Sequence, residues 1–166
     1  MPVIDIKKDP EALTLTLVAE FDASVERVWQ IWEDPRQLER WWGPPTYPAT
    51  FERHEFVVGG RSHYYMTGPD GDQPHGWWTI EAIEEPNRFE FIDGFADENG
   101  EPTDLAKPTR GVVTLEDLGG GRTRMTTVSY FPDTETLQQL SEMGMEDGMR
   151  EAAGQIDDLL ASQPAR

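Results

Sequence analysis

The sequence of 166 residues contains no cysteine, which excludes disulfide bonds, thiolate metal sites and cysteine nucleophiles. Lysine is nearly absent too, since the chain has only Lys7, Lys8 and Lys107. No apolar run approaches the roughly 18 residues of a membrane-spanning helix, and the opening residues MPVIDIKKDPEA do not resemble a signal peptide. These absences predict a cytoplasmic protein without a membrane partner.

Basic residues are scarce as a class. The chain has 14 of them against 32 acidic residues, which gives a formal net charge of -18. Such a surface repels phosphate and therefore argues against nucleic acid or an anionic membrane as a partner. The acidic residues are spread over the whole chain, which favours a soluble acidic surface over an acidic binding site.

The length predicts one domain spanning residues 1–166, with a core of about residues 12–161. Hydrophobic residues make up 37% of the chain, which is below the average for globular proteins. Even so, seven Phe, six Trp and four Tyr residues are far more than a disordered chain carries. We therefore expect a folded, packed protein.

The first third of the chain predicts one strand followed by two short helices. Apolar and polar residues alternate through residues 12–21, which is typical of a strand. From Val25 to Trp32 the apolar residues recur at helical spacing, until Asp34-Pro35 breaks the pattern. A second short helix, from Arg36 to Trp41, is expected to end at the stop Gly43-Pro44-Pro45.

The remainder predicts six more strands and one long C-terminal helix. Gly-, Pro- and Asn-containing turns separate the strands between residues 47 and 131. Residues 133–161 then place Leu137, Met145 and Ile156 on one side of a helix. The expected fold is α+β: a seven-stranded, curved antiparallel sheet around the long helix, with two short helices between strands one and two. A space between sheet and helix follows from that curvature, and whether it is filled or hollow decides the function.

Several short motifs, in this order, carry a resemblance to a known superfamily. They are Ala23-Ser24 with Val28-Trp29, Asp34-Pro35 through Trp41-Trp42-Gly43-Pro44, Val58-Gly59-Gly60-Arg61, Gly68-Pro69-Asp70-Gly71, and Gly144-Met145 with Gly148. The chain resembles the START-like (SRPBCC) helix-grip superfamily, which also contains polyketide cyclases. Its closest resemblance is to the AHSA-like branch, named after the activator of a heat-shock-protein ATPase. The resemblance implies a helix-grip scaffold that binds small apolar molecules.

Aromatic and Met residues are expected to line the space between sheet and helix, because they alternate on the strands and recur in the last helix. The candidate ligand-binding residues are Trp41, Trp42, His54, Phe56, Tyr64, Met66, Trp78, Phe91, Met145 and Met149. Trp29 and Trp32 are interpreted as structural packing. Trp41 and Trp42, beside the rigid Gly-Pro-Pro turn, are interpreted as the gate of the pocket.

A polar group on the inner wall would permit catalysis, and the candidates are His54, Tyr64 and Glu52. Strict alternation places Glu52 on the same face as His54, and His63 on the face of Tyr65. For each candidate, a satisfied hydrogen bond in the core is the commoner role. The sequence therefore favours binding over catalysis. We expect no metal and no cofactor, because none of the three histidines is spaced from another as helical metal ligands are.

Two glycines in the last helix, Gly144 and Gly148, need a reason, since glycine inside a helix costs about 1 kcal/mol relative to alanine. One explanation is close approach of the helix backbone to the sheet. The other is room for a ligand lined by adaptable Met side chains. The sequence leaves both open.

The leading hypothesis is that the chain binds a small hydrophobic molecule in a cavity between the sheet and the C-terminal helix. One alternative is an enzyme of the cyclase or hydratase type, and another is a co-chaperone-like interaction module. An arginine such as Arg61, Arg110 or Arg124 would pair with a ligand carboxylate. An exposed strand edge at residues 12–21 would permit a homodimer.

Overall fold

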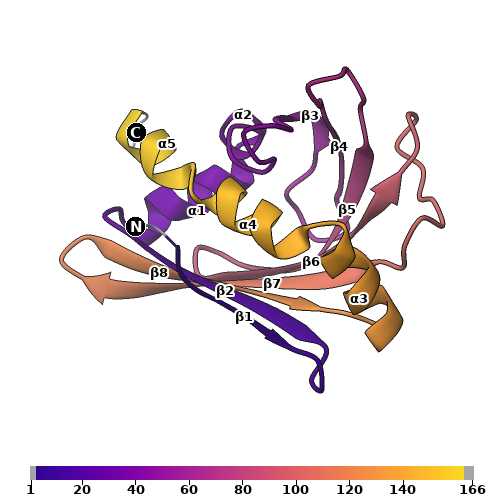
Figure 1. Ribbon diagram of the computed structural model, residues 1–166. Helices are drawn as coiled ribbons and strands as arrows, with labels where there is room; N and C mark the ends of the chain where they lie inside the picture. Colours follow the sequence, from indigo (N-terminus) through magenta and orange to yellow (C-terminus); the bar gives the residue numbers. More distant parts are fainter. Residues whose placement is uncertain (1–2, 163–166) are drawn as a thin grey trace.

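The computed structural model describes residues 3–162, with side chains from residue 5 onward, and Figure 1 shows these residues as one curved sheet and its helices. Residues 1–2 and 163–166 of the predicted domain lie outside the described residues. The strands are β1 (Val3–Asp9), β2 (Thr14–Phe21), β3 (Ala49–His54), β4 (Arg61–Met66), β5 (His75–Glu84), β6 (Arg88–Ala96), β7 (Thr109–Gly119) and β8 (Arg122–Tyr130). The helices are α1 (Val25–Glu33), α2 (Pro35–Leu38), α3 (Thr134–Glu142), α4 (Met145–Ala153) and α5 (Ile156–Ser162).

All pairings in the eight-stranded sheet are antiparallel, in the order β1-β2-β8-β7-β6-β5-β4-β3. The sheet curves strongly, and the helices lie on its concave side (Figure 1). The two short helices α1 and α2 connect β2 to β3, as the sequence predicts. The predicted α+β helix-grip fold is confirmed. Among residues 3–162, no helix is long and apolar enough to cross a bilayer.

The predicted count of seven strands is wrong, because residues 3–9 form an additional edge strand, β1. This strand pairs with β2, whose other side pairs with β8. The edge at residues 12–21, which the dimer hypothesis used, is therefore occupied within the chain. Charged Lys7 and Lys8 on β1 are typical of an edge strand that resists pairing with another molecule.

The predicted long C-terminal helix is divided into α3, α4 and α5. The first break falls at Gly144, whose φ of +86° lies in the left-handed region that favours glycine. The second falls at Gly154 and Gln155. There the side chain of Gln155 donates a hydrogen bond to the Gly43 carbonyl at 2.7 Å, which ties the break to the turn after α2. Both breaks let the C-terminal segment follow the curve of the sheet.

Trp29 and Trp32 are 2% and 1% exposed, and both pack in the core, although Trp32 also lines the cavity described below. Trp32 lies at the centre of an aromatic cluster, with its ring centroid 4.6 Å from that of Trp41 and 5.1 Å from that of Phe89. Its indole N–H also contacts the sulfur of Met125 at 3.4 Å. Through these aromatic contacts, α1 and the turn after α2 pack against the sheet.

A β-bulge in β3 overturns the predicted alternation of its side chains. The register with β4 shifts between Phe51 and Arg53, so Glu52 and Arg53 both face solvent. Phe51 and His54, three positions apart, therefore both contact the core. Glu52 lies on the outer face with His63 and not beside His54, because a bulge inserts one residue and inverts the alternation.

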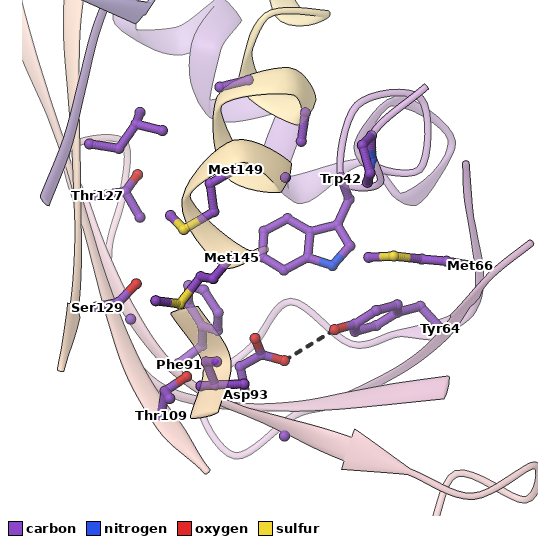
Figure 2. Close-up of a pocket in the computed structure, with 18 of the residues that line it drawn as sticks. Trp42, Tyr64, Met66, Phe91, Asp93, Thr109, Thr127, Ser129, Met145 and Met149 are labelled. Carbon is purple, nitrogen blue, oxygen red and sulfur yellow. Dashed lines mark hydrogen bonds between the residues drawn. The ribbon is translucent and has the colours of Figure 1, made fainter. Parts of the chain in front are cut away.

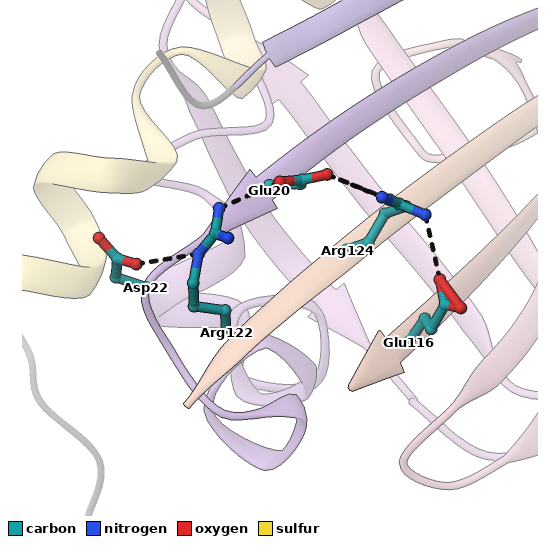
Figure 3. Close-up of polar contacts among 5 residues, drawn as sticks. All are labelled: Glu20, Asp22, Glu116, Arg122 and Arg124. Atoms are coloured by element: carbon teal, nitrogen blue, oxygen red, sulfur yellow. Dashed lines mark hydrogen bonds and ion pairs between the residues drawn. The ribbon is translucent and has the colours of Figure 1, made fainter. Parts of the chain in front are cut away.

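Part of the acidic surface is neutralised by cross-strand ion pairs on the sheet (Figure 3). Arg124 pairs with Glu20 on β2 at 3.0 Å and with Glu116 on β7 at 3.4 Å. Arg122 pairs with the same Glu20 and with Asp22. The hydrogen bond from Arg124 is the main cause of the lowered pKa of Glu20. Exposed pairs of this kind contribute little to stability individually, and their main effect is to reduce local repulsion.

Candidate ligand-binding cavity

A cavity of about 330 Å³ lies between the concave face of the sheet and helices α3 and α4. The sheet side is formed by residues of β2, β4, β6, β7 and β8, and the remaining walls by residues of α1, α3, α4 and the turn after α2. Figure 2 shows Met145 and Met149 projecting from α4, with the indole of Trp42 between them and Tyr64. The space that the curvature predicts is therefore hollow.

Seven of the ten candidate ligand-binding residues line this cavity. They are Trp41, Trp42, Tyr64, Met66, Phe91, Met145 and Met149. They come from α4, the turn after α2 and strands β4 and β6, which the fold brings together from distant parts of the sequence. Their position on the wall follows from the period-two and helical patterns, and their contact with a ligand stays a prediction.

The other three candidates lie elsewhere in the core. Trp78 is fully buried and stacks on Phe91 with ring centroids 4.4 Å apart. Phe56 packs edge-on against Trp29 and Phe89 at 5.5 and 5.0 Å. Neither residue is part of the cavity lining, and neither is His54. Sequence alternation identifies which face of a strand a side chain lies on. It does not identify whether that side chain packs against other core residues or borders the cavity.

His54 is a hydrogen-bonded core residue, and the structure corrects its placement as a catalytic candidate. Its Nε2 atom lies 2.8 Å from the carbonyl of Trp32, which can only accept, so Nε2–H donates. Its Nδ1 atom then accepts from the Ser62 hydroxyl at 2.7 Å. Burial lowers the pKa of His54, which favours this neutral form. Glu52, the other displaced candidate, faces solvent.

Asp93 is the residue that sequence reasoning missed. It lies on the cavity wall, where the hydroxyl of Tyr64 donates a hydrogen bond to Oδ1 at 3.2 Å (Figure 2). The residue is half-buried and lines the cavity, and its desolvation there raises the pKa of the carboxyl from 3.8 to about 7. The sequence indicates its face, because Phe89, Phe91 and Asp93 alternate at period two on β6, but it does not indicate that the carboxyl is desolvated.

Gly76 permits the contact between Tyr64 and Asp93. Tyr64 on β4 stands opposite Gly76 on β5, and β6 lies on the other side of β5. A Cβ added at Gly76 would overlap the ring and hydroxyl of Tyr64, so only glycine leaves the phenol a path across the strand. Gly111 on β7 similarly accepts the ring of Phe91, where a Cβ would stand 2.7 Å from two ring carbons. Both glycines let an aromatic side chain lie flat on the cavity wall.

Trp42 adds a second polar group to the same corner. Its indole lies edge-on to the Tyr64 ring at 6.0 Å, and its buried Nε1 atom has no hydrogen-bond partner among the described residues. Burial is the main cause that raises the pKa of Tyr64 well above its usual range, and the N–H of Trp42 opposes this rise, although its contact with Tyr64 does not meet the geometry of a hydrogen bond. An unpaired buried donor costs stability, and a ligand oxygen would satisfy it.

Hydroxyl groups extend the polar part of the lining along β7 and β8. Thr109 stands opposite Asp93 in the sheet register, and Ser129 and Thr127 follow on β8. Lys107 also borders the cavity and forms a 2.6 Å ion pair with Asp133. The cavity is therefore amphipathic, with Met and aromatic side chains on one part of its wall and oxygen atoms on the other.

The arginines considered as partners for a ligand carboxylate are placed elsewhere. Arg124 belongs to the surface ion pairs described above, and Arg110 pairs with Glu90 at 2.7 Å. Arg61 borders a separate hollow on the outer face. Since none of the three lines the cavity, the only cationic side chain there is Lys107.

The structure distinguishes between the two explanations for the helical glycines. An added Cβ at Gly148 meets no atom within 4 Å, so close approach to the sheet does not explain this glycine. Gly148 instead lines the cavity, beside Met145 and Met149, and enlarges it. Gly144 has a different role, because its positive φ ends one helical segment and begins the next.

The chemistry available in the cavity is proton transfer and hydrogen bonding. A carboxyl group with a pKa of about 7 is partly protonated at neutral pH and can act as either donor or acceptor. Among the described residues that line the cavity, Asp93 is the only carboxylate and there is no histidine, so these residues do not form a set of metal ligands.

A curved antiparallel sheet closed by C-terminal helices over an amphipathic cavity defines a START-like helix-grip protein. A family profile described as "Activator of Hsp90 ATPase homolog 1-like protein" matches residues 22–161, and the chain belongs to this family.

Solved structures support the same assignment. A protein from Arthrobacter aurescens is 59% identical, with a TM-score of 0.92, over 98% of this chain and 94% of that one. Protein Ms6760 from Mycobacterium smegmatis is 48% identical, with a TM-score of 0.87, over 97% and 99% of the two chains. DynU16, a putative protein of the dynemicin biosynthetic locus, shares the fold at 18% identity and a TM-score of 0.60, over 87% of this chain and 47% of its own. A search of curated proteins finds no match.

Proposed function

We propose that this protein binds a small, mostly apolar molecule that carries an oxygen-containing group at one end. The observation that supports this most is the cavity itself, whose volume of about 330 Å³ falls within the range of small-molecule sites. Met, Trp and Phe side chains cover most of its wall, and flexible Met side chains can adapt to the shape of a ligand.

Two polar groups on the cavity wall, from Trp42 and Asp93, support the proposal that the ligand has an oxygen-containing end. Trp42 offers an unpaired N–H, and Asp93 offers a carboxyl that donates when protonated and accepts when ionised. A ligand hydroxyl or carbonyl group at Asp93 would hydrogen-bond with that carboxyl. A permanently anionic ligand is disfavoured there, because an ionised Asp93 would repel it.

Native mass spectrometry of the protein purified from its own host tests this proposal. The wild-type protein is expected to retain an added small-molecule mass, which extraction would identify. Gly148→Leu, which fills the cavity from α4, is expected to abolish the added mass. Glu151→Leu adds the same side chain to an exposed position of the same helix and should retain it. Equal retention by both variants would contradict binding in the cavity.

A second candidate function is proton-transfer catalysis of the cyclase or hydratase type, and Asp93 is the observation that favours it. The ionised carboxylate would take a proton from a carbon next to a carbonyl group, and the Tyr64 hydroxyl would hold it in position. Asp93→Asn is expected to retain ligand and lose turnover, as measured with the compound that extraction identifies. A variant with unchanged turnover would exclude this function while leaving the binding proposal intact.

The co-chaperone hypothesis, which the family description suggests, stays a prediction. Copurification of an ATPase chaperone with the protein from its own host would support it. The cavity variants would distinguish it from ligand binding, because Gly148→Leu leaves the outer surface unchanged.

A further inference from the structure

We propose that Glu52, His63 and His75 form a binding site for a divalent transition metal, with Zn²⁺ as the leading candidate, on the outer face of the sheet. The site is separate from the cavity, since none of the three residues lines it. One ligand atom from each residue lies within 4.8 Å of the other two. Two imidazoles and one carboxylate are a ligand set that zinc uses in proteins.

The two histidines already direct their nitrogens at one another. His63 on β4 and His75 on β5 lie on neighbouring strands, and His63 Nε2 is 2.8 Å from His75 Nδ1. Their ring centroids are 5.0 Å apart with an interplanar angle of 27°, so the rings meet edge to edge. Tetrahedral Zn²⁺ with Zn–N bonds of about 2.0–2.1 Å holds its two nitrogens about 3.3 Å apart. A small rotation of both rings would therefore admit the ion.

The β-bulge in β3 supplies the third ligand. It turns Glu52 to the outer face, where Oε1 lies 3.7 Å from His63 Nδ1, the ring nitrogen that does not face His75. To reach an ion held by His63 Nε2 and His75 Nδ1, the carboxylate has to turn along the edge of the His63 ring, within the 4.8 Å that separates the three ligand atoms. The Glu52 side chain is 51% exposed and can move, whereas that of His63 is 15% exposed and held in place. An exposed, adjustable carboxylate beside two more ordered imidazoles can make this movement when a metal ion binds.

The loop between β6 and β7 restricts the movement of His63. Gly100, at φ +83°, lies so close that an added Cβ would stand 3.0 Å from the ring. The Asp97 carboxylate accepts hydrogen bonds from the backbone of Asn99 and Glu101 and keeps this loop in shape. A hollow of about 140 Å³ adjoins His63, and water there would complete the coordination of the metal.

The charge around the site suits a cation despite two nearby arginines. Arg53 borders the same hollow, but its guanidinium pairs with Glu55 at 2.9 Å. Arg61 also borders it, while Glu101 adds a carboxylate, and the chain as a whole carries a formal charge of -18. Imidazole ligands select Zn²⁺, Co²⁺, Ni²⁺ and Cu²⁺ over Mg²⁺ and Ca²⁺, which prefer oxygen.

The test uses the three histidines of the chain as their own reporters, in protein without a histidine tag. Nitrogen-15 NMR spectra of the imidazoles are recorded during titration with Zn²⁺, and separately with Mg²⁺. We expect Zn²⁺ to shift the His63 and His75 signals and to leave His54, which is fully hydrogen-bonded in the core, unchanged. Mg²⁺ should shift none of them. Unchanged His63 and His75 signals at millimolar Zn²⁺ would overturn the proposal.

Variants then test each ligand by calorimetric titration with Zn²⁺. Glu52→Gln and His75→Asn are each expected to weaken binding by about tenfold or more, as the loss of one of three ligands does. Glu81→Gln, which alters an exposed carboxylate on β5, serves as the matched control and should retain the wild-type affinity. Equal affinity in Glu52→Gln and Glu81→Gln would show that Glu52 is not a ligand. The same titration of Gly148→Leu should be unchanged, since the two sites are independent.

Discussion

Tyr64 donates a hydrogen bond to Asp93 at 3.2 Å across an intervening strand, and it reaches the carboxyl because the residue that it crosses is Gly76. This relationship places the one carboxyl group of the cavity wall, with its pKa of about 7, at a fixed point among apolar side chains.

Tyr64→Phe is expected to raise the pKa of Asp93 further above its ordinary range. The Tyr64 hydroxyl stabilises the ionised carboxylate, so its removal leaves burial unopposed. Carbon-13 NMR of the Asp93 carboxyl during a pH titration measures this directly. Tyr65→Phe, a change on the other face of the same strand, is the control and should leave the titration unchanged. A lower pKa in Tyr64→Phe would contradict the assigned contact.

Gly76→Ala should displace Tyr64 and disrupt its bond to Asp93. The added methyl group would occupy the space of the phenol, and overpacking of this kind costs about 1–3 kcal/mol. Chemical denaturation measures the loss, and the Asp93 titration should move in the same direction as in Tyr64→Phe. If Gly76→Ala left both the stability and the titration unchanged, the proposed path across β5 would be wrong.

The contribution of Asp93 to the stability of the protein is expected to fall as the pH rises from about 4 to about 7. Asp93 has a raised pKa in the folded state, so between its unfolded value near 3.8 and about 7 the folded state binds the extra proton. Its favourable contribution is complete below pH 4 and is lost as the carboxyl ionises.

Asp93→Asn should remove this part of the pH dependence. At pH 8 the variant is expected to be more stable by about 1–3 kcal/mol, an amount reduced by the water that enters the cavity. Denaturant unfolding between pH 5 and 8 measures it, with the exposed Asp104→Asn as control. A variant that is less stable than the wild-type protein at pH 8 would contradict the buried, ionised carboxylate.

Gly144→Ala and Gly148→Ala should change stability in opposite directions, although the two glycines are four residues apart. Alanine at Gly144 would have to adopt a φ of +86°, which costs about 1–2 kcal/mol. Alanine at Gly148 meets open space in a helix and should stabilise by up to about 1 kcal/mol. Thermal unfolding of the two variants and of the wild-type protein measures these changes in stability. Changes of the same sign in both variants would contradict the assigned roles.

Most of the fold follows from local patterns in the sequence. Period-two alternation located the strands from β2 to β8, and Asp34-Pro35 located the boundary between the two short helices. The second of these ends at Leu38, before the predicted Trp41. Strand β1 was not predicted, because its charged residues 7 and 8 interrupt the alternation of apolar and polar side chains. Charged residues of this kind are usual on an edge strand. The long helix was predicted unbroken, since a glycine in a helical pattern does not by itself reveal whether its φ is positive.

The site was predicted less completely, because its key relationships depend on register between strands. Asp93 continues the pattern of Phe89 and Phe91, yet a polar residue at the end of an apolar face carries no sign of burial in the sequence. The contact of His63 with His75 arises from neighbouring strands of a hairpin, 12 residues apart. The bulge that moves Glu52 to the outer face breaks the alternation on which the prediction relied.

The methionine methyl groups offer the most direct test of a ligand-binding cavity. Met66, Met125, Met145 and Met149 line it, whereas Met143 is 54% exposed and stands outside it as an internal control. Carbon-13 methyl spectra of the labelled protein are recorded during titration with 2-naphthol, a planar apolar molecule with one hydroxyl group. We predict that the four cavity signals shift together and saturate, while the Met143 signal stays in place. Cavity signals that do not respond, or a response confined to Met143, would contradict the account.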